Sequence, residues 1–214
     1  MSRRRSNRAS PCMNAIFDTL YHDLHEMGTL STEYWQKQMH KVPSTTNVDR
    51  VRFLEGACQD KGVLHLGSTG PLHARLATTA KTLYGLDLVV NGGPCVVQCD
   101  LDHLGEPPTL PVSWPDVDLI IAGEVLEHLS NPGHLLDACH RQYPTALLIV
   151  SVPYAGICGI DARGYENVNR EHVAWYSYTT LTTLLGRAHY RPMTWHWYTT
   201  PAGHREGLIM VAEP

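Results

Sequence analysis

The sequence contains no apolar run close to the roughly 20 residues that a membrane-spanning helix requires. Its N-terminus carries four arginines among residues 3–8, but no apolar segment of a secretory signal follows them. The composition, with 43% hydrophobic and 18% charged residues, is that of an ordinary globular protein. We therefore expect a soluble, cytoplasmic protein without membrane insertion.

The sequence also lacks a Cys-x-x-Cys pair, internal repeats and low-complexity segments. Several cysteines lie inside apolar runs, where a thiol acts as a small hydrophobic side chain, so we expect no disulfides. A formal net charge of −4 argues against nucleic-acid binding, and residues 1–12 are interpreted as a disordered basic tail. A length of 214 residues suits one α/β domain better than two. The six cysteines are Cys12, Cys58, Cys95, Cys99, Cys139 and Cys158.

Residues 13–58 are predicted to form a helical segment. Apolar residues recur at helical spacing as far as Gly28, and a second helix is expected to end before Pro43. A third helix is suggested by Val48, Val51 and Leu54. Such a segment either covers the edge of a sheet or lies over an active-site mouth as a lid, and the sequence leaves both alternatives open.

Residues 59–214 alternate short apolar runs with amphipathic segments, which is typical of β-α-β units in a parallel sheet. A helix is expected from Leu72 to Ala80, another after Asn131-Pro132, and a third after Ser177. The last two runs flank residues 201–204 and predict an antiparallel hairpin. A long loop from Pro153 to about His172 is expected to be functional, because connectors in compact domains are usually shorter. The predicted strands are 63–66, 83–86, 95–98, 119–122, 147–152, 193–198 and 208–212.

Polar residues follow three of these predicted strands. A glycine turn with Gly67 and Gly70 follows the first, and it would let backbone approach a ligand closely. Asp87 ends the second strand, where a carboxylate can accept two hydrogen bonds from a ribose diol, and Asp100 follows the third, within reach of an adenine amine. Each Asp could instead cap a turn or a helix. The G-x-G-x-x-G pattern of dinucleotide-binding domains is absent.

These stretches resemble the class I S-adenosylmethionine-dependent methyltransferases. The resemblance covers residue 63 to the C-terminus, and its most specific part is residues 118–129, Asp-Leu-Ile-Ile-Ala-Gly-Glu-Val-Leu-Glu-His-Leu. It implies a Rossmann-like, seven-stranded, mostly parallel sheet with a C-terminal antiparallel hairpin. The sequence departs from the family at His65, where an acidic residue is usual, and at Thr69 or Pro71, where a third glycine is usual. The cofactor-binding residues implied by the resemblance are Gly67, Ser68, Thr69, Gly70, Asp87, Leu88, Asp100, Leu101 and Glu124.

A second group of residues is expected beside the cofactor. Glu124, Glu127 and His128 follow the fourth strand at spacings that place them on one side of a turn, as ligands for a divalent cation such as Mg, Mn, Fe or Zn. With His172 they resemble the metal site of ubiquinone-pathway O-methyltransferases and of the 2′-O-methyltransferases that act on small-RNA 3′ ends. Family members without a metal carry the same Glu-x-x-Glu-His pattern, so a metal-free alternative stays open.

The function expected from the resemblance is methyl transfer from S-adenosylmethionine to an oxygen of a small or carbohydrate-like acceptor. His128, His172 and Glu124 are the candidate catalytic residues. The alternatives are a non-catalytic cofactor-binding subunit, a 2′-O-methyltransferase of RNA 3′ ends and a nicotinamide-dependent oxidoreductase, although the glycine turn and the final hairpin argue against the last. Five aromatic residues either line the acceptor pocket or belong to the core: Trp175, Tyr176, Trp195, Trp197 and Tyr198.

Overall fold

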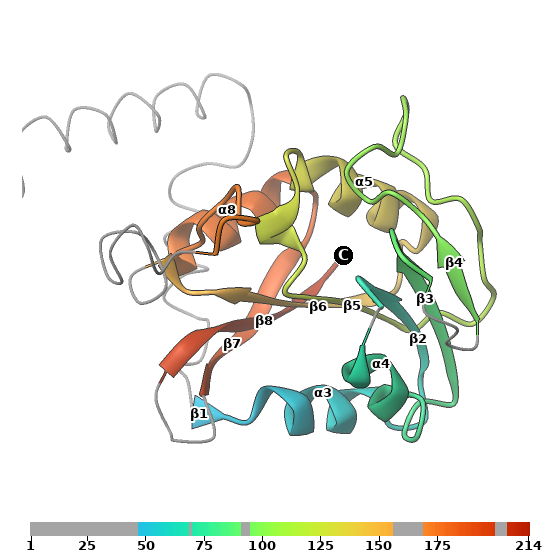
Figure 1. The fold of residues 1–214 in the computed structure, drawn as a ribbon, viewed down its shortest axis with the longest axis horizontal. Helices are drawn as coiled ribbons and strands as arrows, with labels where there is room; N and C mark the ends of the chain where they lie inside the picture. Colours follow the sequence, from blue (N-terminus) through green and yellow to red (C-terminus); the bar gives the residue numbers. More distant parts are fainter. Residues whose placement is uncertain (1–46, 69, 91–94, 156–168, 200–204) are drawn as a thin grey trace, which may run out of the picture. The chain divides into compact units, whose positions relative to one another are not determined.

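The computed structural model describes residues 47–68, 70–90, 95–155, 169–199 and 205–214, and they build one eight-stranded sheet (Figure 1). The strand order is β1-β7-β8-β6-β5-β2-β3-β4. Neighbouring strands from β6 to β4 run parallel, whereas β8 is antiparallel to both β6 and β7. The strands are β1 (Asn47–Val48), β2 (Gly62–Leu66), β3 (Thr82–Asp87), β4 (Val96–Gln98), β5 (Leu119–Gly123), β6 (Leu147–Pro153), β7 (Arg191–Thr199) and β8 (Arg205–Glu213).

Strands β2 to β8 are the seven that the sequence predicts, and the fold class is confirmed. The additional strand, β1, pairs in parallel with β7 and places Val48 opposite Tyr198. The prediction of Val48 in a helix is therefore wrong. Helix α3 (Arg50–Cys58) begins only after Asp49, whose side chain accepts the backbone N–H of Arg52.

The helices cover the two faces of the sheet in pairs. Because side chains alternate along a strand, Val63 packs with α3 and α4 (Pro71–Leu76), whereas its neighbour Leu64 packs against the opposite layer. That layer holds α5 (Pro132–Gln142) and α8 (Tyr178–Arg187) (Figure 1). Two apolar cores result, one on each face, and helix α3, which the sequence assigned to the N-terminal segment, covers the sheet.

The helix starts follow local sequence signals to different degrees. Ser177 and Thr180 form a reciprocal capping box at the start of α8. Helix α5 begins with Pro132 as predicted, but the side chain of Asn131 makes no capping hydrogen bond. Helix α4 ends at Leu76, earlier than the predicted residue 80, and Ala80 instead forms a β-bridge with Gln59.

Several expectations fall outside the described residues. These are the basic tail, the first two helices of residues 13–58, Thr69, most of the long loop and the hairpin turn at 201–204. Cys12 and Cys158 also lie there, whereas the four cysteines that the structure describes are free thiols. Within the described ranges, no helix has both the length and the apolar character needed to cross a membrane.

Candidate cofactor and metal site

The predicted site residues meet at one edge of the sheet. Gly67 follows β2, Asp87 ends β3, Asp100 lies just after β4 and Glu124 follows β5. These strands are parallel neighbours, so their carboxyl ends lie side by side. In open α/β sheets this is the edge where ligands bind.

The turn after β2 requires glycine. Gly67 has a φ of +68°, and a Cβ atom there would lie 2.5 Å from Cγ2 of Val125. Its N–H donates to the carbonyl oxygen of Leu86 over 2.9 Å, which brings the turn against β3. Gly70, with a φ of +87°, precedes the first residue of α4. The turn therefore presents backbone to the sheet edge, as the sequence predicts.

Ser68 of this turn is buried, with 3% of its surface exposed. Its Oγ has no hydrogen-bond partner among the described residues. A buried hydroxyl without a partner is unfavourable, so a polar ligand atom at this position would stabilise the turn.

Asp87 and Leu88 combine a carboxylate with an apolar surface. Asp87 is buried and accepts the backbone N–H of Val89 over 3.0 Å. Three consecutive apolar side chains follow it, and Leu88 is 58%, Val89 54% and Val90 44% exposed. Exposed apolar residues beside a polar acceptor are typical of a binding surface for a nucleoside, whose base is apolar and whose sugar is polar.

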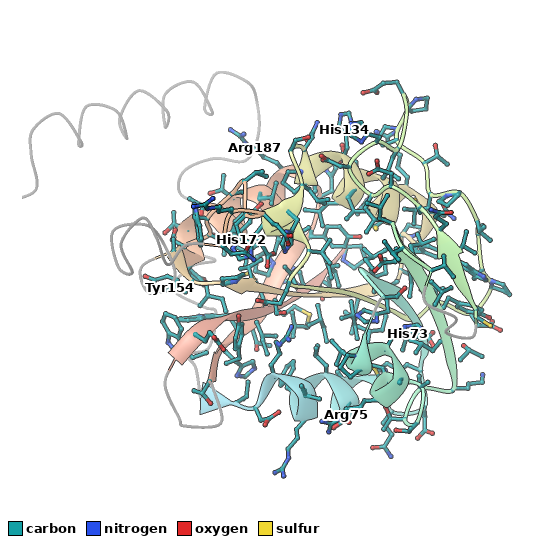
Figure 2. The ribbon with its side chains drawn as sticks, viewed as in Figure 1. His73, Arg75, His134, Tyr154, His172 and Arg187 are labelled. Carbon is teal, nitrogen blue, oxygen red and sulfur yellow. The ribbon has the colours of Figure 1, made fainter. Side chains whose placement is uncertain are left out.

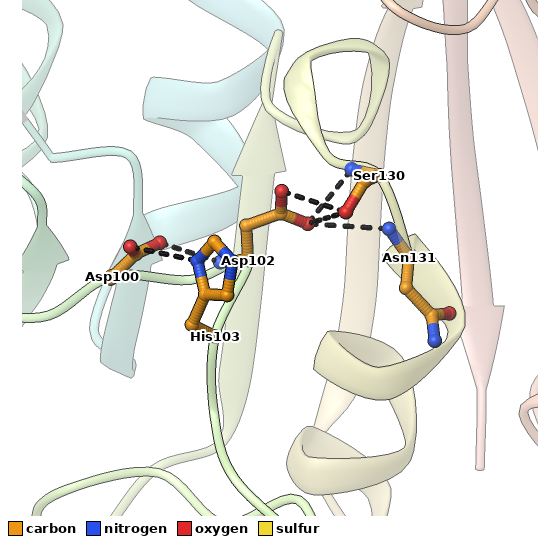
Figure 3. A network of polar contacts seen from close by, with 5 residues as sticks. All are labelled: Asp100, Asp102, His103, Ser130 and Asn131. Carbon is orange, nitrogen blue, oxygen red and sulfur yellow. Dashed lines mark hydrogen bonds and ion pairs between the residues drawn. The ribbon is translucent and has the colours of Figure 1, made fainter.

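Asp100 lies where predicted, but its carboxylate caps a turn (Figure 3). It accepts the backbone N–H of Asp102 over 3.0 Å and lies 2.9 Å from Nδ1 of His103, and these hydrogen bonds lower the pKa of Asp100. Leu101 is buried, with its side chain in the core under α5. The turn-capping alternative therefore describes the contacts that Asp100 makes in this structure.

Asp102, which the sequence analysis missed, joins two loops at the site (Figure 3). Its carboxylate accepts the backbone N–H of Ser130 over 2.8 Å, the hydroxyl of Ser130 and the N–H of Asn131. The loop after β4 is thereby attached to the start of α5. No sequence signal separates this Asp from other polar loop residues.

Three of the four predicted metal ligands come together. One ligand atom from each of Glu127, His128 and His172 lies within 4.8 Å of the others. Glu127 and His128 belong to a short 3-10 helix, η1 (Leu126–His128), whereas His172 arrives from more than 40 residues later. The rings of the two histidines meet edge to face, with centroids 4.7 Å apart.

Backbone hydrogen bonds hold this group in place. The carbonyl oxygen of Glu127 accepts the N–H groups of Val173 and Ala174, which follow His172 in the chain. Nδ1 of His128 lies 3.2 Å from the carbonyl oxygen of Glu171. Because a carbonyl can only accept, Nδ1 is the protonated nitrogen in this contact, and the lone pair of Nε2 remains for a ligand.

The buried side chains of this group have unpartnered polar atoms within the described chain and shifted pKa values. Glu127 is 1% exposed, and neither carboxylate oxygen has a hydrogen-bond partner among the described residues. Burial, followed by the nearby charge of Glu124, raises the pKa of Glu127 to about 8. Burial and the neighbouring His128 lower the pKa of His172, whose buried Nδ1 also has no partner within the described chain.

Glu124, the fourth predicted ligand, lies outside this group. Its carboxylate accepts the hydroxyls of Ser151 (3.0 Å) and Tyr198 (2.9 Å) and lies 3.8 Å from the guanidinium of Arg50. Its φ is +58°, which is uncommon for a residue with a side chain and typical of functional turns. Burial raises the pKa of Glu124, although Arg50 and the two hydroxyls act in the opposite direction.

The sequence analysis missed the partners of Glu124. Arg50 lies at the start of α3, on the face of the sheet opposite to α5 and α8. Tyr198 was grouped with Trp195 and Trp197, but strand alternation places it on the α3 face and the two tryptophans on the α8 face. Alternation along β7 was the signal that could have separated them. Tyr176 is buried and donates to the carbonyl oxygen of Leu126, whereas the ring of Trp175 meets that of His172.

His65, the departure from the family pattern, is buried against a second histidine. Its Nδ1 lies 3.1 Å from Nδ1 of His73, and the two rings are stacked. Burial, His73 and Arg50 lower the pKa of His65 to about 3, so the side chain is neutral near pH 7. His73 lies on the α4 side of the sheet and His172 on the α8 side (Figure 2).

The residues present fit a divalent cation better than they fit a closed core. One carboxylate and two imidazoles form a ligand set used for Zn, Fe and related ions, and it leaves positions open for other ligands. The buried carboxylate of Glu127 has no partner within the described chain, and an ion would supply one.

No protein-family model matches the sequence, and no curated protein matches it either. Solved structures do match the fold. The 1,6-didemethyltoxoflavin-N1-methyltransferase of Burkholderia thailandensis, with 1,6-didemethyltoxoflavin and S-adenosylhomocysteine bound, has a TM-score of 0.58 and 18% identity over 98% of this chain and 92% of its own. An S-adenosylmethionine-dependent methyltransferase of Mesorhizobium loti has a TM-score of 0.58 and 16% identity, covering 77% of this chain and 96% of its own. The magnesium protoporphyrin IX methyltransferase of Synechocystis, with S-adenosylhomocysteine bound, has a TM-score of 0.54 and 18% identity, covering 77% of this chain and 80% of its own. The described chain therefore has the fold of S-adenosylmethionine-dependent methyltransferases.

Proposed function

We propose that the protein transfers a methyl group from S-adenosylmethionine to an oxygen of a small or carbohydrate-like acceptor, assisted by a divalent cation. The observation that carries this proposal is the group Glu127, His128 and His172, which includes a buried carboxylate without a partner in the described chain. It follows β5 at the same sheet edge as Asp87, so a nucleoside and a cation would lie close to each other.

The cofactor end would use the turn after β2 and the end of β3. Backbone of Gly67 and Gly70 would approach the ligand, and Ser68 offers a hydroxyl that has no partner in the described chain. Asp87 would accept the ribose hydroxyls, with the exposed side chain of Leu88 against the base. Asp100 and Leu101 would contribute less, because one caps a turn and the other is buried in the core.

The chain would mainly position the acceptor. The sulfonium of S-adenosylmethionine supplies a methyl group that is already electrophilic, so alignment and proton removal are the remaining tasks. Glu127, His128 and His172 would hold a cation, which when bound lowers the pKa of a coordinated hydroxyl. Glu124, the predicted fourth ligand, is bonded to Ser151 and Tyr198 instead. An acceptor with two adjacent hydroxyls suits such a site, because both oxygens can be ligands.

Without a bound cation, His172 would not be a ligand and would instead act as the base that removes the proton. The pKa of His172 is lowered by burial and by His128, so the ring is neutral near pH 7 and can accept a proton from the acceptor hydroxyl. The Nδ2 amide of Asn169 donates to Nε2 of His172 over 3.0 Å, so this ring nitrogen would exchange that hydrogen bond for the acceptor hydroxyl when it acts as base. Glu124 is less suited to this role, because each of its two oxygens already accepts a hydrogen bond from a hydroxyl.

Calorimetry with S-adenosylmethionine, and separately with Mn²⁺ or Zn²⁺, tests the two binding parts of the proposal. Transfer of labelled methyl to catechol and to methyl glucoside, with and without chelator, tests the reaction. We expect cofactor binding and chelator-sensitive transfer to a diol. Absence of cofactor binding would reject the proposal, and binding without transfer to any acceptor would favour the non-catalytic subunit. Transfer confined to an amine or to RNA 3′ ends would replace the acceptor class.

A further inference from the structure

Arg50 and Glu124 form an ion pair that the contacts in the described chain leave incomplete. Nη1 of Arg50 lies 3.8 Å from Oε1 of Glu124 and 3.4 Å from Oγ of Ser151. Both distances are longer than those of strong charge-assisted hydrogen bonds, about 2.7–2.9 Å. The two side chains are each 27% exposed. The pair is thus partly buried, but solvent can still reach it.

The guanidinium of Arg50 has donors to spare. Its polar contacts among the described residues involve Nη1, and its Cζ lies over the ring of Tyr198, 5.6 Å from the ring centre. An arginine carries five N–H donors in a planar fork that matches the two oxygens of a carboxylate. The remaining edge of the fork therefore suits a ligand carboxylate.

Glu124 is arranged as the opposite half of such a site. Each of its oxygens accepts one hydroxyl, from Ser151 or from Tyr198, and each keeps a second acceptor position. Its carboxylate contacts Arg50 of α3 and Tyr198 of the core on the α3 face, and it lies outside the group of Glu127 and the histidines. A primary ammonium with three N–H donors would complete these acceptors.

The side chain at position 65 does not bind a ligand ammonium. A ligand ammonium needs a negative partner, and His65 is neutral because burial, His73 and the charge of Arg50 lower its pKa. Nη1 of Arg50 lies 3.7 Å from the position that a Cβ atom of Gly123 would occupy, which places the guanidinium at the carboxyl end of β5. Arg50 and Glu124, one positive and one negative side chain, therefore lie at the carboxyl end of β5, which is the neighbour of β2 in the sheet.

We propose that Arg50 and Glu124 bind the zwitterionic amino-acid end of the cofactor, Arg50 contacting its carboxylate and Glu124 its ammonium. This inference rests on the proposed function, because it requires a nucleoside cofactor that carries an α-amino acid. It assigns to this pair the charge recognition that position 65 does not supply. Tyr198 and Ser151 orient the pair and do not contact the ligand.

Binding calorimetry with ligands that lack one charge tests the assignment. The parent ligand is S-adenosylhomocysteine, and the others are its decarboxylated form, its deaminated form and 5′-methylthioadenosine, which lacks the amino-acid end. Arg50→Gln should weaken binding of the parent roughly 10- to 100-fold and leave the decarboxylated ligand within about 2-fold. Glu124→Gln should weaken the parent similarly and spare the deaminated ligand. Arg52→Gln, on the exposed side of α3, should change none of them.

Equal weakening of all four ligands by Arg50→Gln would mean that Arg50 only supports the fold, and it would overturn the inference, as would no weakening at all. Arg50→Lys keeps the charge without the fork; it should fold and show an intermediate loss confined to the ligands that carry a carboxylate. Wild-type protein that binds 5′-methylthioadenosine but does not prefer the parent would reject the charged pair alone. Wild-type protein that binds none of the four would reject the proposed function as well.

Discussion

The backbone N–H of Val173 donates to the carbonyl oxygen of Glu127 over 2.8 Å, so the loop that carries His172 is attached directly to the turn after β5. Ala174 donates to the same oxygen. The two segments of the proposed metal site are therefore connected by main-chain hydrogen bonds and do not depend on a cation to meet. A preformed site of this kind binds its ion without first ordering the chain.

Substitution of His172 by alanine should lower the affinity for Mn²⁺ or Zn²⁺ by at least about 10-fold, because it removes one of the three proposed ligands. Calorimetry with the metal alone measures this, and S-adenosylhomocysteine affinity should stay within about 2-fold. His134→Ala, on α5 away from the group, is the matched control. Equal metal affinity in wild type and both variants would remove His172 from the site.

Glu127→Gln should stabilise the metal-free protein at alkaline pH. The folded-state pKa of Glu127 is about 8 and its ordinary value is 4.5, so between these values the folded protein holds a proton that the unfolded chain releases. The contribution of this carboxyl is complete below pH 4.5 and is lost as the pH rises through 8. The variant should gain on the order of 2 kcal/mol over wild type between pH 6.5 and 8.5.

Urea denaturation in the presence of chelator measures that difference. The window lies above the range in which His65, with a pKa of about 3, contributes. The control variant is Glu171→Gln, at an exposed carboxyl in the adjoining segment. A stability difference between Glu127→Gln and wild type that does not vary with pH would contradict the assigned pKa. Metal affinity of the wild type should rise over the same interval, because the ligand must be ionised.

Asp87→Ala should weaken S-adenosylmethionine binding roughly 10- to 100-fold, through the loss of hydrogen bonds between a charged acceptor and the ribose. Calorimetry is again the measurement, with Asp137→Ala, a partly exposed carboxyl on α5, as control. Because Asp87 also accepts the N–H of Val89, circular dichroism should verify that the variant is folded. Undiminished affinity in a folded variant would refute the cofactor assignment.

Gly67→Ala and Gly70→Ala separate two effects in the turn after β2. Both glycines have positive φ, but only at Gly67 would the new methyl group meet another atom, Cγ2 of Val125 at 2.5 Å. Gly70→Ala should cost about 1 kcal/mol, and Gly67→Ala about 2–4 kcal/mol with weaker cofactor binding. Adding Val125→Ala to Gly67→Ala should restore part of the cofactor affinity. Equal losses in both single variants would show that the contact with Val125 is unimportant.

Ser177→Ala should destabilise the protein by about 1 kcal/mol, because the hydroxyl accepts the N–H of Thr180 at the start of α8. Denaturant unfolding gives the value. Thr183→Ala, an exposed hydroxyl on the same helix, should cost less than about 0.5 kcal/mol. A larger loss at Thr183 than at Ser177 would contradict the capping assignment.

The sheet was predictable because its strands are short apolar runs separated by polar turns, and such runs are recognisable without tertiary information. The edge that holds the candidate site followed from the predicted parallel direction of the strands, since side chains after parallel strands gather at one edge. The face of the sheet on which each of these side chains lies could not be predicted from the sequence. Glu124 and Glu127 share one motif, yet the left-handed backbone at Glu124 directs it to Ser151 and Tyr198 while Glu127 meets the histidines.

Other misses have the same origin. Strand β1 has two residues and forms through its pairing with β7. A segment this short has no recognisable strand pattern in the sequence. Asp100 and Asp102 are alike in sequence, but Asp100 caps its own turn, whereas Asp102 binds the start of α5 because the backbone of Ser130, 28 residues away, lies beside it. Interactions between residues far apart in the chain set these outcomes, so the pattern around each residue does not contain them.

The pairing of Val48 with Tyr198 connects the start of the described chain to its last two strands. Arg50 lies two residues after Val48, and the hydroxyl of Tyr198 donates to Glu124. The positions of both Arg50 and Glu124 therefore depend on β7. Removal of β7 would take away both the partner strand of β1 and the hydroxyl that Glu124 accepts, and would therefore disturb the two side chains that we propose to bind the amino-acid end of the cofactor.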